Sequence, residues 1–146
     1  MVHKISHNHG MYGDIKLFAG TAIPEVARGI SEYLNIPLSG RDIIEYANEN
    51  LWVRLHNSVR GQDVYLIQNT SRPVHRNLME LLITLQTLRL DSAGRVTAVI
   101  PHLSYTRSDK KDSHAGRLSP APAAAARTCC RFAPAASMIR RRSTRR

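Results

Sequence analysis

Cysteine and long apolar runs are both scarce in this chain of 146 residues. Its only two cysteines, Cys129 and Cys130, are adjacent in the sequence. Neighbouring cysteines seldom form a disulfide with each other, and two thiols without a second pair make no zinc-binding set. No apolar stretch approaches the ~20 residues that span a bilayer, and the N-terminus lacks the apolar core of a signal peptide. We therefore expect a cytoplasmic protein that makes no contact with a membrane.

Acidic residues are absent from the C-terminal segment 113–146, although the segment holds eight of the 21 basic residues, all of them arginines. The other 13 basic residues share residues 1–112 with all 11 acidic ones, so the body of the protein carries a net charge of only +2. Most of the overall net charge of +10 therefore lies in the C-terminal segment. Clustered arginines bind phosphate backbones nonspecifically, but Phe132 is the only aromatic residue in this tail, so a nucleic-acid partner is not expected.

Both ends of the chain lack the apolar periodicity of folded structure. Residues 113–146 are rich in alanine, proline and arginine, and such a segment cannot offset its ordering entropy by burial. Residues 1–13 are polar and aperiodic, and the histidines in that arm have no carboxylate or cysteine partner with which to form a metal site. We predict a folded domain over residues 14–112 between two disordered ends.

The body of the chain alternates strand and helix patterns, which indicates an α/β fold. Residues 15–19 form an apolar run ended by Gly20, after which Thr21 can cap a helix with Pro24 in its first turn. Residues 63–68 and 95–101 read as buried strands on either side of a leucine-rich helical stripe, for which Gly94 is the expected stop. This order predicts a parallel βαβ unit in a sheet whose two faces are both covered by helices.

The middle of the chain is less regular. Three apolar residues, Leu51, Val53 and Leu55, alternate with Trp52, Arg54 and His56. This alternation favours a half-exposed strand that forms one arm of a hairpin. Before them lies the stretch from Tyr46 to Asn50, where an aromatic residue is followed by alternating polar groups. Such a stretch can hold a flat heterocycle, although composition alone favours an exposed turn.

Five segments, in order, resemble the N-terminal half of ribose-phosphate pyrophosphokinase. They are KLFAG at residues 16–20, SVRGQDVYLIQ at 58–68, NLMELL at 77–82, SAGRVTAVIP at 92–101 and YTRSDKKD at 105–112. The resemblance implies a phosphoribosyltransferase-like α/β domain. It also implies a transferase of nucleotide biosynthesis, a kinase that passes the β,γ-diphosphoryl group of Mg-ATP to ribose 5-phosphate, with Mg²⁺ as cofactor.

The resemblance also implies an ATP-binding site in two pieces. Adenine is held in the family by an aromatic residue and two polar residues at alternating positions, which correspond here to Tyr46, Asn48 and Asn50. Tyr46 stands where the family usually has Phe, and Asn50 where it usually has Glu. A loop from the neighbouring subunit completes the site, and its counterparts are Arg107, Ser108, Asp109, Lys110, Lys111 and Asp112.

A second implied site binds a regulatory phosphate. Ser58 and Arg60, in the turn SVRG, resemble part of that site in the family. From the residues alone, a plain turn with a solvated arginine is favoured. The resemblance assigns no catalytic residue and no metal ligand to this sequence.

The resemblance ends at Asp112, where family members continue into an Asp-Leu-His strand and a second domain that binds ribose 5-phosphate. The residues that follow here have codons rich in G and C, so we expect an incomplete domain, truncated or frameshifted after Asp112. Such a chain is expected to be inactive alone and to expose the edge of its last strand. Homo-oligomers, or association with a full-length paralogue as a non-catalytic regulatory subunit, are the alternatives for its assembly.

Overall fold

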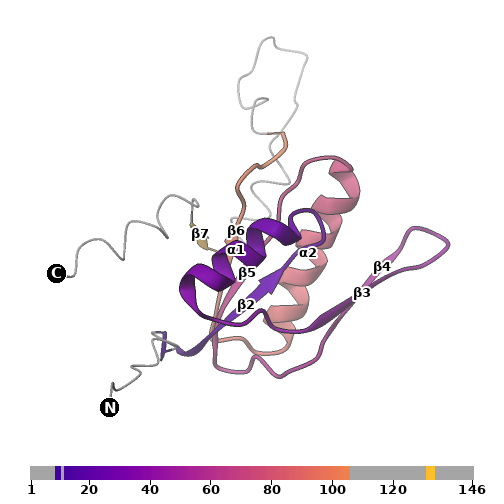
Figure 1. Cartoon of the computed structure of the whole chain (residues 1–146). Coiled ribbons are helices and arrows are strands. Elements are labelled where there is room, and N and C mark those ends of the chain that lie inside the picture. The colour runs from indigo at the N-terminus through magenta and orange to yellow at the C-terminus, as the bar shows by residue number, and fades with distance from the viewer. Residues whose placement is uncertain (1–8, 11, 106–130, 134–146) are drawn as a thin grey trace, which may run out of the picture.

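The computed structural model describes residues 9–10, 12–105 and 131–133, and its main feature is one twisted sheet with a hairpin beside it (Figure 1). In spatial order, the strands of this sheet are β1 His9–Gly10, β2 Gly13–Ala19, β5 Asp63–Ile67, β6 Arg95–Val99 and β7 Arg131–Ala133. Strands β2, β5, β6 and β7 run parallel, and β1 is antiparallel to β2. The remaining elements are the hairpin strands β3 Arg41–Glu45 and β4 Leu51–Leu55 and the helices α1 Pro24–Leu34 and α2 Val74–Leu90.

The predicted βαβ unit is confirmed. Strand β5 leads through α2 into β6, with Asp63 opposite Arg95 and Ile67 opposite Val99 in a parallel register. Strand β2 pairs with the other side of β5, so β5 is the central strand of the sheet, and four of its five residues are buried. The predicted hairpin is confirmed as well, because β3 and β4 pair antiparallel from Arg41 and Leu55 to Glu45 and Leu51.

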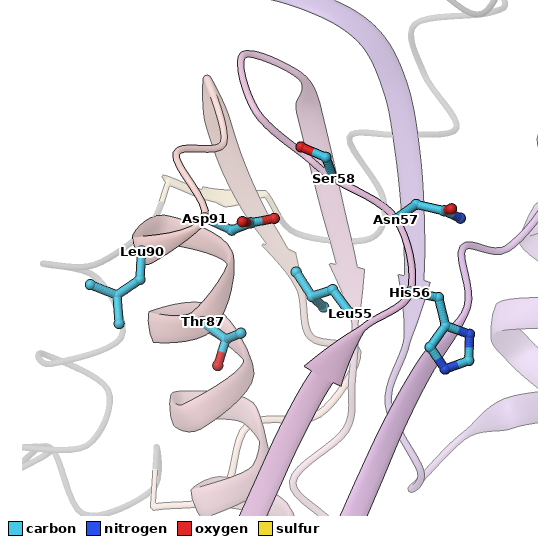
Figure 2. A pocket seen from close by; sticks show the side chains of 7 residues that line it. All are labelled: Leu55, His56, Asn57, Ser58, Thr87, Leu90 and Asp91. Carbon is cyan, nitrogen blue, oxygen red and sulfur yellow. The ribbon is translucent and has the colours of Figure 1, made fainter.

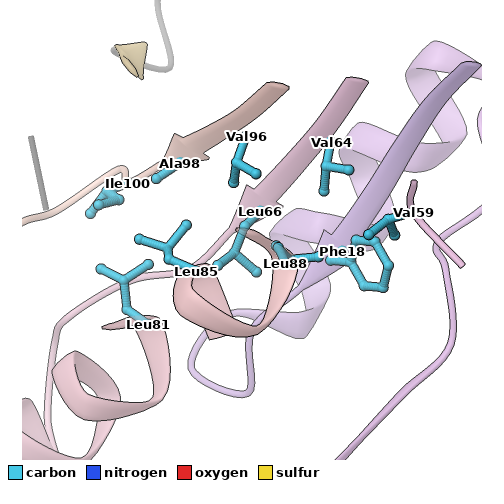
Figure 3. Close-up of a cluster of buried hydrophobic side chains, with 10 residues drawn as sticks. All are labelled: Phe18, Val59, Val64, Leu66, Leu81, Leu85, Leu88, Val96, Ala98 and Ile100. Atoms are coloured by element: carbon cyan, nitrogen blue, oxygen red, sulfur yellow. The ribbon is translucent and has the colours of Figure 1, made fainter. Parts of the chain in front are cut away.

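Alternation along the central strands divides the core between the two faces of the sheet. On one face, Phe18, Leu66 and Ala98 pack against α2 (Figure 3). On the other, Ile67 and Val99 pack against α1. Successive side chains of a strand point to opposite faces, so both faces of this sheet require a helix. The predicted α/β class with helices on both faces is confirmed.

Both helices end in a Schellman arrangement that the sequence did not reveal. The left-handed residue is Asn35 after α1 and Ser92 after α2. After α2, the Ser92 N–H donates to the Arg89 carbonyl oxygen and the Ala93 N–H donates to that of Leu88. The prediction that Gly94 stops this helix is therefore wrong. Gly94 is needed for close packing instead, because a Cβ there would lie 2.8 Å from the carbonyl oxygen of Gly61.

The start of α1 also differs from the prediction. Ile23 is the N-cap residue and makes no side-chain cap, while Pro24 begins the helix as expected. Thr21 lies two residues before that N-cap residue, and its backbone N–H and hydroxyl both donate to the carboxylate of Glu80. A contact with α2 thus takes the hydroxyl that local spacing assigned to a helix cap.

Two short strands lie within the segments predicted to be disordered. Strand β1 falls within residues 1–13, and β7 falls within residues 113–146. Strand β7 pairs with Thr97, Ala98 and Val99, so β6 is not the exposed edge that the sequence predicted. Pairing of this kind satisfies backbone groups that an edge strand leaves free. Tyr12 and Gly13 are also described, and residues 1–8, 11, 113–130 and 134–146 lie outside the described residues.

Within the described part of the chain, no helix is long and apolar enough to cross a membrane.

Candidate functional site

The three residues assigned to adenine binding lie together at the tip of the β3–β4 hairpin. Hydrogen bonds close the turn, from the Tyr46 N–H to the Asn50 carbonyl oxygen and from the Glu49 N–H to the Tyr46 carbonyl oxygen, both at 2.9 Å. The Asn48 side-chain oxygen accepts the Asn50 N–H at 3.3 Å. The tip projects from the body of the molecule (Figure 1), and the Tyr46 side chain is 53% exposed.

A groove of about 600 Å³ runs between this tip and α2. All three predicted residues line it, and Trp52, Met79 and Ile83 are among its other lining residues. The aromatic rings and thioether offer flat apolar contacts, and the side-chain amides offer both donors and acceptors. The structure therefore brings Tyr46, Asn48 and Asn50 together on a surface suited to a heterocyclic base.

Glu45, which directly precedes Tyr46, joins the hairpin to α2 through Arg76. The Arg76 Nε donates to Glu45 Oε2 at 2.7 Å, and its Nη1 donates to Thr21 Oγ1 at 3.0 Å and to Glu80 Oε2 at 3.2 Å. The hydrogen bond to Glu45 is the main reason that the pKa of Arg76 is raised. No local pattern in the sequence indicates this cluster, because its members come from three separate segments.

Glu80 is the buried centre of the cluster, with 1% of its side chain exposed. Besides Thr21 and Arg76, it faces Arg41, whose Nη2 lies 4.0 Å from Glu80 Oε1 and whose Nε donates to the carbonyl oxygen of Ala19. Burial lowers the pKa of Arg41, and the charge of Glu80 opposes that shift. A buried carboxylate with several donors is a rigid anchor for the groups around it.

A second groove, of about 900 Å³, lies between the hairpin tip and the first turn of α2. Its charged or titratable lining residues are Glu45, Glu49, Arg72, His75 and Arg76. Tyr105 reaches this region, since its hydroxyl lies 3.1 Å from His75 Nδ1. The predicted loop residues Arg107, Ser108, Asp109 and Asp112 follow Tyr105 in the sequence and lie outside the described residues.

Ser58 and Arg60 lie at the other end of the hairpin, in the turn between β4 and β5. Ser58 lines a shallow pocket of about 490 Å³ (Figure 2). The Arg60 N–H donates to Ser58 Oγ at 3.3 Å, and the Val59 N–H donates to Asp91 Oδ2 at 3.3 Å. Asp91 thus takes a backbone donor of the turn and adds negative charge beside the position predicted to bind phosphate. No local pattern in the sequence places this carboxylate beside the turn, because Asp91 lies 32 residues further along the chain than Val59.

The described residues contain no group of three or more histidine, cysteine, aspartate or glutamate side chains that could hold a metal ion. The carboxylates of the YTRSDKKD segment, Asp109 and Asp112, fall outside those residues. The expected Mg²⁺ therefore has no protein ligand set in this part of the chain, and it stays an expectation tied to ATP.

Comparison with known proteins agrees with the resemblance in the sequence. Residues 15–127 match the sequence model of the N-terminal domain of ribose phosphate pyrophosphokinase, a match that continues past the predicted limit at Asp112. The chain is 46% identical over 97 residues to the ribose-phosphate pyrophosphokinase of Maricaulis maris, and 47% identical over 98 residues to that of Haemophilus ducreyi. These matches cover 66% and 67% of this chain but only 31% of each relative.

The fold has a solved counterpart in phosphoribosylpyrophosphate synthetase from Mycobacterium smegmatis. The two structures align with a TM-score of 0.75 and 34% sequence identity, over 82% of this chain and 41% of the other. The chain spans about a third of the length of its curated relatives. Because the matched domain covers most of this sequence, the chain belongs to the ribose-phosphate pyrophosphokinase family and carries its N-terminal domain.

Proposed function

We propose that the chain binds Mg-ATP at the hairpin tip and is the nucleotide-binding part of a cytoplasmic ribose-phosphate diphosphokinase. The whole enzyme would transfer diphosphate from Mg-ATP to ribose 5-phosphate. The observation that supports this role most directly is the groove that gathers Tyr46, Asn48 and Asn50 beside α2. Membership of the family supports the assignment of ATP and ribose 5-phosphate as the substrates of the whole enzyme.

The residues of the tip divide the recognition of the base between them. The ring of Tyr46 is half-exposed and free to stack on the adenine face. The amides of Asn48 and Asn50 can donate to ring nitrogens and accept from the exocyclic amino group. By resemblance, Arg107, Asp109 and Asp112 of a neighbouring subunit complete the site, so full affinity requires an oligomer.

Replacing Tyr46 by alanine is expected to weaken Mg-ATP binding about tenfold, because stacking on an aromatic ring is worth about 1–3 kcal/mol per base. Isothermal titration calorimetry of the oligomeric protein measures the change. Tyr33→Ala serves as the matched control, since Tyr33 is exposed on α1 and lines neither groove at the hairpin tip. Equal affinities of the Tyr46→Ala variant and the wild type would exclude the tip as the base-binding site.

The 146-residue chain is expected to form no phosphoribosyl pyrophosphate from Mg-ATP and ribose 5-phosphate. Phosphoryl transfer depends on holding the donor and acceptor in line and on stabilising the charge that spreads over the phosphoryl oxygens. The described residues offer a surface for the base, and the resemblance assigns no acceptor site to this sequence. A coupled assay for AMP release checks this, and turnover above the background rate would contradict it.

A regulatory subunit of a full-length enzyme is the second candidate function. Ile44 and Trp52, which pair across the hairpin, are 43% and 42% exposed. Exposed apolar pairs of this kind suit a protein interface. Co-purification with a full-length paralogue, with an altered turnover rate of that enzyme, would favour this role over the first. A chain that stays monomeric and does not bind the paralogue would exclude this role.

A further inference from the structure

Arg76 connects three parts of the fold that are distant in the sequence. Its guanidinium binds Glu45 at the end of β3 and Thr21 after β2, and it also binds Glu80 one turn further along α2. Glu80 is almost wholly buried, and its other carboxylate oxygen, Oε1, accepts a hydrogen bond from the Thr21 backbone N–H at 2.8 Å. One side chain therefore links the hairpin to a rigid point in the body of the molecule.

The hairpin tip has few other attachments. Val53 is the only buried residue of β3 and β4, and it lies in the middle of β4. The tip residues from Glu45 to Asn50 are all exposed. A two-stranded hairpin is marginally stable by itself, so its outer end stays in place only through contacts with other elements. Among the described residues, the ion pair between Glu45 and Arg76 is the only one that joins the tip to α2.

The geometry of the contact requires an arginine. The Nε atom binds Glu45 while Nη1 of the same planar group binds Thr21 and Glu80. A lysine ammonium has three donors on one freely rotating nitrogen, and it lacks the planar group that holds two carboxylates in this fixed arrangement.

We propose that Arg76 is a positioning residue for nucleotide binding, which holds Tyr46 at the groove by tethering Glu45 to the buried Glu80. This inference rests on the proposed function of the tip. It adds a residue that does not touch the base, lies outside the five segments of resemblance and acts through Glu45.

The test compares Arg76→Gln, Glu45→Gln and the double variant with the wild type. Two quantities are measured in each protein. One is the dissociation constant for Mg-ATP, and the other is acrylamide quenching of Trp52, the only tryptophan in the chain and a lining residue of the groove at the tip. Arg72→Gln is the matched control. Arg72 lines the neighbouring groove and carries the same charge, but it makes no ion pair with any residue that the structure describes.

Each single variant is expected to raise the dissociation constant about threefold, in line with the weak coupling of partly exposed ion pairs, and to increase the quenching of Trp52. The double variant is expected to bind as weakly as the weaker single variant and no worse, because the two residues act as one tether. Arg72→Gln is expected to match the wild type in both measurements.

A purely structural role for Arg76 would lower the melting temperature and leave the Glu45→Gln variant unchanged in affinity and quenching, and that result would overturn the inference. Additive losses in the double variant would overturn it as well. If the wild-type chain fails to bind Mg-ATP, the proposed function falls, and quenching of Trp52 decides the tether alone. Increased quenching in both single variants then supports it, and unchanged quenching rejects it.

Discussion

Replacing Leu85 by alanine is expected to lower the free energy of unfolding by about 3 kcal/mol, because the change leaves a cavity in the main core. Leu85 is 1% exposed and belongs to the cluster that packs α2 against the sheet (Figure 3). The side chains between α2 and the sheet are closely packed, so the neighbours of Leu85 have little room to move into the cavity. Urea unfolding followed by circular dichroism measures the loss.

Leu90→Ala is the matched control for this change. Leu90 ends the same helix and is 75% exposed, so the identical substitution there should change stability by less than about 0.5 kcal/mol. Similar losses for the two variants would mean that α2 does not bury the face seen in this fold.

Removing the carboxylate of Glu80 is expected to destabilise the protein by a similar amount, about 3 kcal/mol for Glu80→Ala. The side chain of Arg41 is only 13% exposed and would keep its charge without an opposing group. The two donors of Thr21 and one from Arg76 would also lose their acceptor. Thermal unfolding of the variant and the wild type at the same pH checks the result.

Two further variants keep this prediction testable if Glu80→Ala fails to fold. Glu80→Gln retains the shape and some hydrogen bonds, and its loss should lie between those of the wild type and the alanine variant. Glu45→Ala removes a carboxylate from the same arginine, but Glu45 is 43% exposed, so the cost should stay below about 1 kcal/mol. A larger cost at Glu45 than at Glu80 would contradict the assignment of Glu80 as the anchor.

Local patterns were sufficient to predict β2, β5 and β6, the two helices and the parallel connection of β5 to β6. Residues 63–68 and 95–101 were apolar enough to require burial on both faces, and β5 and β6 occupy those positions. The alternation of Leu51, Val53 and Leu55 predicted one arm of a hairpin, because successive side chains of a strand point to opposite faces and only one of those faces is apolar here.

The tip residues Tyr46, Asn48 and Asn50 came from the resemblance, and the structure adds the groove that places them beside Met79 and Ile83 of α2. Two features of the helix ends were mispredicted, namely the cap of α1 by Thr21 and the stop of α2 at Gly94. Asn35 and Ser92 end the helices in left-handed conformations, and Gly94 packs against Gly61 instead. A non-glycine residue adopts that conformation only where surrounding contacts hold it there, and such contacts are not visible in local sequence.

The sequence by itself determined the α/β class, the order of elements and the family, because these depend on hydrophobic periodicity and on short motifs that are local in the chain. Tertiary structure alone decided the pairing of β7 with β6 and the cluster of Thr21, Arg41, Glu45, Arg76 and Glu80. Those contacts join residues up to 59 positions apart. No periodic signal links such residues, since only the packing of helix against sheet and hairpin brings their charges together.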